Sequence, residues 1–117
     1  MSDDAKWHWG EGTKYAIEGA KSMLIINGAA SVSVLTFIGN VKVHSKYLIY
    51  SMISFGFGVL FSVLILVFAY SAQLNYGNNN FSYAHRWHVL TYAAVIFSVA
   101  LFVAGIGMAA CGFLQLP

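Results

Sequence analysis

Three long stretches without a charged side chain constrain this chain more than any other feature. Residues 22–41, 47–85 and 87–117 contain no Asp, Glu, Lys or Arg, and most of their residues are apolar or small. Hydrocarbon offers no water to backbone amides, so a spanning segment satisfies them internally as an α-helix of about 20 apolar residues. The sequence therefore predicts an all-α integral membrane protein with three transmembrane helices, near residues 20–40, 46–73 and 84–113.

The composition agrees with this class and argues against others. Charged residues make up 9% of the 117 residues, whereas soluble domains contain about 25%. The chain has no basic block or acidic tail, so we expect the lipid bilayer, and no nucleic acid, among its partners. A single cysteine, Cys111, excludes an internal disulfide and is interpreted as a small apolar packing residue.

The N-terminal segment, residues 1–21, holds all four acidic residues and three of the six basic ones. We expect a short amphipathic helix here that lies in the membrane interface. Gly10 and Gly12 are expected to interrupt it before a second helical segment continues into the first span. The predicted organisation is thus an interfacial segment at 1–21 followed by a three-helix transmembrane domain at 22–117.

Two connections and the basic residues define the expected topology. Gly77 and the three asparagines after it tolerate a left-handed backbone, which predicts a loop within residues 73–82. The N-terminal segment and this loop then lie on one side of the membrane. That side holds four basic residues, Lys6, Lys14, Lys21 and Arg86 after the loop, against Lys42 and Lys46 between the first two spans. The positive-inside rule places the N-terminus in the cytoplasm.

Small and polar residues recur on helical faces of the spans. Asn27, Ser31 and Val34 share one face of the first span, and such a face avoids lipid by meeting another helix. In the second span a small residue recurs every fourth position, and the third span has two faces of small residues. We predict that an oligomer or pore seam includes Asn27, Ser31, Ser33, Ser54, Gly58, Ser62 and Gly105.

The histidines are the main candidates for metal binding or pH sensing. His85 and His88 stand three residues apart at the start of the third span, and His8 falls on the same side of the membrane. Three imidazoles can bind zinc or titrate together near neutral pH. Against this, His-x-x-His is a weak motif, and histidine at a headgroup boundary needs no further role.

The spans carry no acid, base or histidine near their expected middles, where membrane enzymes and transporters usually place one. The sequence therefore predicts a protein that is not an enzyme and has no cofactor.

A sequence pattern in the first span resembles a known group of proteins. Asn27-Gly28-Ala29-Ala30 lies inside the span, and Leu35-Thr36-Phe37-Ile38-Gly39 follows near its end. This pattern is similar to that of small three-span bacterial membrane proteins of unknown function. The resemblance implies a bacterial or phage origin, three spans and the bacterial inner membrane, and it supplies no activity. In size and topology the chain is also similar to class I phage holins, although residues 112–117 lack their charged tail.

Two functions follow from these expectations. The first is a self-associating, non-enzymatic membrane protein that forms a pore or permeabilises the membrane, as a holin-like or phage-defence effector does. The second is an accessory subunit, in which the same polar face meets a larger membrane protein. A carrier of metal or cofactor would be a third function and would require His8, His85 and His88.

Overall fold

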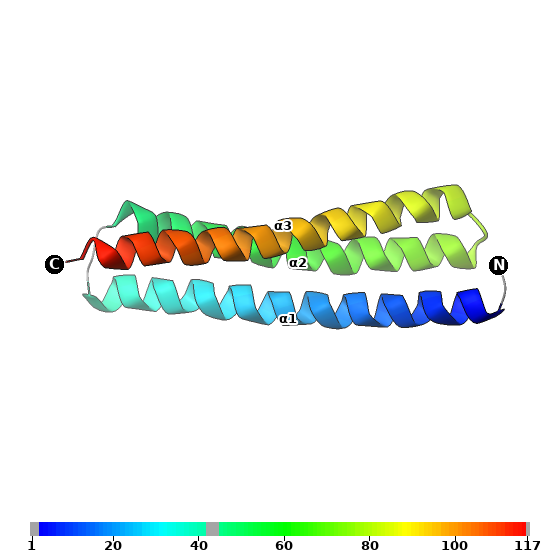
Figure 1. Cartoon of the computed structure of the whole chain (residues 1–117), viewed down its shortest axis with the longest axis horizontal. Coiled ribbons are helices and arrows are strands. Elements are labelled where there is room, and N and C mark those ends of the chain that lie inside the picture. The colour runs from blue at the N-terminus through cyan, green and yellow to red at the C-terminus, as the bar shows by residue number, and fades with distance from the viewer. Residues whose placement is uncertain (1–2, 42–44, 117) are drawn as a thin grey trace.

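The computed structural model describes residues 3–41 and 45–116 as three long helices arranged side by side (Figure 1). They are α1 (Asp3–Val41), α2 (Lys46–Gly77) and α3 (Phe81–Leu114). The bundle measures 62 × 19 × 18 Å, and no strand occurs among the described residues. Each helix is long and apolar enough to cross a membrane. The predicted all-α class is confirmed, and α1 begins at the same end of the bundle as the α2–α3 turn (Figure 1).

The separate interfacial helix expected before the first span is not found. Gly10 and Gly12 lie inside α1, and no glycine of the described residues has a positive φ. Glycine in a helix interior costs about 1 kcal/mol relative to alanine, too little to end a helix that continues on both sides. α1 therefore passes through the expected boundary at residues 21 and 22 as one helix of 39 residues, about 58 Å long at 1.5 Å per residue.

The turn between α2 and α3 is shorter than the loop expected at residues 73–82. It consists of residues 78–80, and Asn79 adopts the left-handed conformation with a φ of 61°. The Asn80 amide donates to the Asn75 carbonyl (2.8 Å) and the Asn79 amide donates to that of Tyr76 (3.1 Å). These two bonds form a Schellman motif, which ends α2 by satisfying its last carbonyl groups. The predicted left-handed turn is confirmed.

We expect Asn79→Val to destabilise the bundle by about 1–2 kcal/mol, because a residue with a Cβ branch resists the left-handed conformation. Asn79→Gly should leave stability unchanged or slightly higher, since glycine enters this conformation freely. Reversible unfolding of both variants in the same detergent mixture measures the difference. Equal stability of the two variants would contradict the role assigned to this turn.

The closest packing joins α2 to α3 through small and hydroxylated residues. Ser51 Oγ donates to the Gly105 carbonyl (2.8 Å), and Ser54 Oγ donates to that of Leu101 (2.7 Å). Further along, the hydroxyls of Ser62 and Ser98 lie 3.0 Å apart. One of the two predicted small-residue faces of α3 makes this contact, and its buried members are Ala94, Ser98, Gly105, Ala109 and Gly112.

The first helix packs mainly on α2. Ala20 forms an apolar cluster with Ile65 and Ala94, and Val34 forms another with Leu48 and Phe55. The outward surfaces of α2 and α3 are largely exposed apolar side chains over most of their length, such as those of Phe57, Leu60, Val67, Ile96, Val103 and Ile106. Hydrocarbon can contact such a surface without loss of hydrogen bonds.

Candidate functional site: the outer face of the first helix

Most residues predicted to form an oligomer seam lie between helices of a single chain. Five of the seven are buried in the bundle: Asn27, Ser54, Gly58, Ser62 and Gly105. Ser31 is half-buried, and its hydroxyl donates to the Met52 carbonyl of α2 (3.4 Å). Ser33 alone of the seven is exposed, and its hydroxyl donates to Ala29 in its own helix (2.7 Å). The small-residue faces thus hold the three helices together.

Asn27 occupies the contact between α1 and α2. Its side chain is 0% exposed, and its Nδ2 donates to the Met23 carbonyl of the same helix (3.0 Å). Its Oδ1 has no hydrogen-bond partner and lies directly over Gly58, whose missing side chain provides the space. A Cα–H of glycine can make a weak contact with such an oxygen. Asn27 therefore fixes the packing of α1 on α2 by shape more than by hydrogen bonding.

The opposite side of α1 combines exposure with polarity. We call this surface the α1 outer face. Glu11 and Glu18 stand seven residues apart on it, as do Lys14 and Lys21, and the face continues with small, hydroxylated and apolar residues. Lys14 Nζ pairs with Glu11 (3.1 Å), and Lys21 Nζ pairs with Glu18 (3.6 Å). The α1 outer face consists of Asp4, Trp7, Glu11, Lys14, Glu18, Lys21, Ser22, Ile25, Ala29, Val32, Ser33, Thr36 and Asn40.

The packing of α1 places these charges at the same height along the bundle as apolar parts of α2 and α3. Lys21 follows Ala20, which contacts Ile65 and Ala94. Ile65 lies eight residues inside the end of the span predicted near residues 46–73, about 12 Å along the helix. The Glu18–Lys21 pair is therefore level with segments that sequence analysis assigned to the membrane. The sequence prediction placed residues 1–21 at the membrane interface. The seven-residue spacing of the charges was readable in the sequence, whereas their level relative to α2 and α3 was not.

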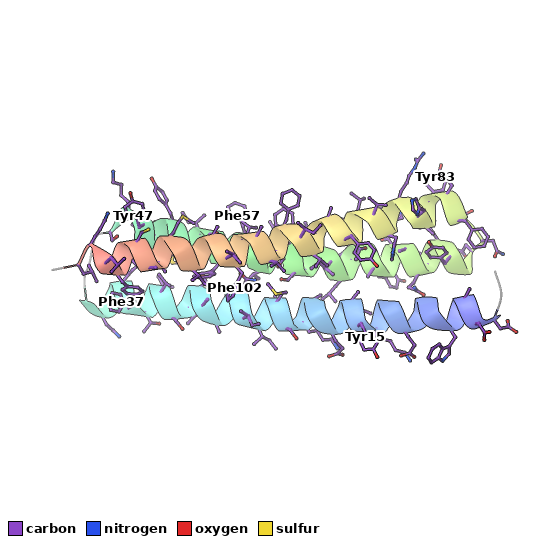
Figure 2. All side chains as sticks on the ribbon, in the orientation of Figure 1. Tyr15, Phe37, Tyr47, Phe57, Tyr83 and Phe102 are labelled. Atoms are coloured by element: carbon purple, nitrogen blue, oxygen red, sulfur yellow. The ribbon has the colours of Figure 1, made fainter. Side chains whose placement is uncertain are left out.

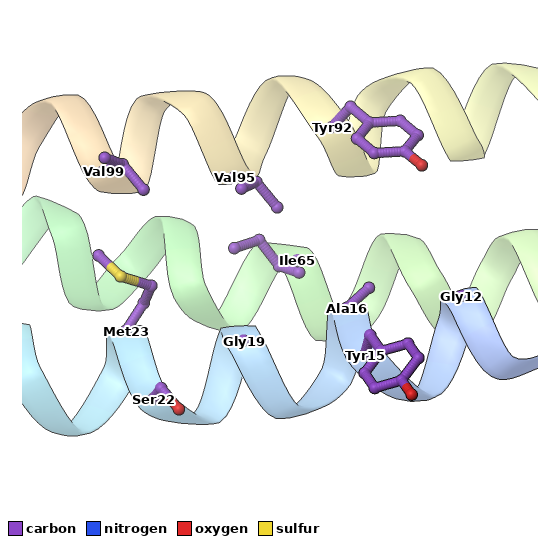
Figure 3. A pocket seen from close by; sticks show the side chains of 10 residues that line it. All are labelled: Gly12, Tyr15, Ala16, Gly19, Ser22, Met23, Ile65, Tyr92, Val95 and Val99. Carbon is purple, nitrogen blue, oxygen red and sulfur yellow. The ribbon is translucent and has the colours of Figure 1, made fainter.

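An apolar groove separates α1 from α3 at the same level (Figure 3). Its volume is about 550 Å³, and in Figure 3 the phenol rings of Tyr15 and Tyr92 lie at one end of it. The only other side-chain hydroxyl in the lining belongs to Ser22, which donates to the Glu18 carbonyl (3.0 Å). The groove therefore offers a surface for hydrocarbon and no acid or base. Its lining is Gly12, Tyr15, Ala16, Gly19, Ser22, Met23, Ile65, Tyr92, Val95 and Val99.

The structure places two of the three candidate histidines near one another at the start of α3. His85 is exposed, whereas His88 is half-buried with its ring edge-on to that of Tyr92 (centroids 4.6 Å apart). The side chain of His8 lies outside the described residues. Within the part of the chain that the structure describes, no three histidine, cysteine or acidic side chains gather in a metal-binding arrangement.

Comparison with known proteins adds no relative: no family model, curated protein or solved structure matches the chain. The candidate site therefore rests on its geometry. In Figure 2, aromatic residues such as Phe57 and Tyr83 lie on the outside of α2 and α3, and Tyr15 lies on α1. The α1 outer face differs because it carries paired charges and hydroxyls beside its exposed apolar residues Trp7, Ile25 and Val32.

Proposed function

We propose that the protein is a non-enzymatic membrane protein that self-associates through the α1 outer face and forms a polar seam or narrow pore. One observation carries this proposal: the exposed Glu18–Lys21 ion pair lies level with the apolar residues Ile65 and Ala94. A holin-like or phage-defence effector that permeabilises the bacterial inner membrane is the most concrete form of this function. In this proposal the N-terminus lies on the cytoplasmic side, where the positive-inside rule places it.

The physical argument is the poor fit between this face and lipid. Ionisable side chains at membrane depth usually face a bundle interior or a water-filled cavity, because hydrocarbon does not solvate them. In water, exposed ion pairs of this kind contribute little to stability. The Glu11–Lys14 and Glu18–Lys21 pairs thus give the isolated chain little, but they provide a surface that a second copy or a water column can cover.

The polar character continues along α1 toward its C-terminal end, which suits a pore. Ser22 and Ser33 donate their hydroxyl protons to carbonyl groups of their own helix, so their oxygens remain able to accept from water. Thr36 and Asn40 are exposed further along the same face. Hydroxyl and amide groups can wet a narrow path without a fixed charge. An accessory subunit would instead present this face to a larger membrane protein.

The test replaces four of the five charged residues of the face, Glu11, Lys14, Glu18 and Lys21, with leucine and leaves Asp4 in place. The wild type should form particles of several subunits in lipid bilayers and release a dye from vesicles. The leucine variant should still insert, because its face now suits lipid, but dye release should fall to background. Subunit counting by stepwise photobleaching and dye release on the same vesicles measure both effects.

The control is Lys46→Leu, which also removes a charge but lies away from the α1 outer face. It should retain both association and dye release. A wild type that inserts as a monomer and purifies only with a larger membrane protein would reject self-association in favour of the accessory role. Metal analysis of the same preparation tests the histidine alternative.

A further inference from the structure

The charges of the α1 outer face form two separate rows, and we infer that the occupant of this face is a second copy of the chain in parallel orientation. In this contact the acidic row of one copy meets the lysine row of the next. The inference rests on the proposed function and specifies its interface. It identifies the partner by charge complementarity, since the face carries both members of each pair.

The rows follow from the helix geometry. Each residue turns the helix by about 100°, so residues seven apart lie within about 20° of each other. Asp4, Glu11 and Glu18 therefore form one row, and Lys14 and Lys21 form another. A step of three residues displaces the second row by about 60° around the axis. With respect to a line midway between the two rows, the acids thus lie on one side and the lysines lie on the other.

Symmetry then selects the orientation of the neighbour. When parallel helices pack around a common axis, each flank of one copy meets the opposite flank of the next, as in the charge pairs of parallel coiled coils. Every acidic row then faces a lysine row. In an antiparallel pair each flank meets its own equivalent, so glutamates would face glutamates. Copies inserted in one direction are parallel, in agreement with the charge pattern.

The lysines can leave their partners in the same chain and pair with glutamates of a neighbouring copy. The Glu18–Lys21 separation of 3.6 Å is long for a charge-assisted hydrogen bond, and more than half of the Lys21 side chain is exposed. A lysine side chain is flexible and can turn toward a neighbouring carboxylate without movement of the backbone. C-terminal to the charged residues, Ile25 and Val32 continue the seven-residue spacing of Glu11 and Glu18 and supply an apolar contact between copies.

The experiment uses two full-length variants of opposite charge. One carries Glu11→Lys and Glu18→Lys, so that residues 11, 14, 18 and 21 are all basic; the other carries Lys14→Glu and Lys21→Glu, so that these four residues are all acidic. Each variant alone should lose at least about tenfold in the fraction of oligomer, because like charges that face each other oppose association. Mixing differently tagged variants in one bilayer should restore assembly as mixed particles, measured by two-colour co-localisation.

Recovery in the mixture also shows that neither variant is misfolded. A third variant with all four charges reversed should associate alone as the wild type does, whereas Lys46→Glu is the control for altered net charge. If the wild type forms oligomers and both single-sign variants associate equally well, this inference is overturned and the proposed function still stands. A failure of the mixture to associate, with both variants inserted and helical, would overturn it as well. A monomeric wild type would reject both.

Discussion

Gly105→Ala is expected to destabilise the bundle by about 1–3 kcal/mol, the usual range for overpacking a filled core. A Cβ at this position would lie 2.6 Å from the ring of Phe55. That ring is buried and packs against Phe102 with centroids 5.7 Å apart, so it has no free space to enter. The α2–α3 contact must therefore widen, which also strains the hydrogen bond from Ser51 to the Gly105 carbonyl.

The matched control is Gly107→Ala, two residues further along the same helix. No atom lies within 4 Å of a Cβ built there. Alanine should therefore leave stability unchanged or raise it by about 0.5–1 kcal/mol through its better helix propensity. Unfolding of the two variants and the wild type, followed by helix content in one mixed-micelle series, gives the comparison. A Gly105→Ala protein as stable as Gly107→Ala would show that Phe55 does not pack on this glycine.

Local rules were sufficient to predict α2, α3 and a turn between them. Long apolar runs require internal hydrogen bonding in a membrane, so α2 and α3 were predictable from composition and length. The Gly-Asn-Asn-Asn sequence predicted residues that tolerate a left-handed backbone, and the structure places that conformation at Asn79. Gly10 and Gly12 were misread because propensity is a weak local term, and a helix continues through glycine when both flanking segments are helical.

The partners of each helical face could not be predicted in the same way. Periodicity shows that Ser54, Gly58 and Ser62 share a face, but the same spacing suits contact within a chain and contact between chains. The position of each helix along its neighbour decides whether a face makes contact within the chain or between chains. This position depends on long-range packing such as that of Ala20 against Ile65. The same register brings the charged half of α1 beside apolar segments, so the candidate site became visible only in the structure.

The contact between Asn27 and Gly58 should appear as an energetic coupling. Gly58→Ala places a methyl group on the buried Asn27 carboxamide, and α1 must move away from α2 to accommodate it. We expect a loss of about 1–3 kcal/mol for this variant. Gly56→Ala, two residues earlier in α2, is the control, since nothing lies within 4 Å of its Cβ. Its stability should match or exceed that of the wild type.

Asn27→Ala removes the obstacle that makes Gly58→Ala costly, and it also removes a buried oxygen that has no hydrogen-bond partner. The double variant should therefore be more stable than the sum of the two single effects predicts, by about 1–3 kcal/mol. Additivity to within about 0.5 kcal/mol would mean that the two residues do not touch. Because Asn27 is buried inside one chain, the cycle should change unfolding without changing the number of subunits per particle. A change in subunit number at unaltered stability would instead place Asn27 at the contact between copies.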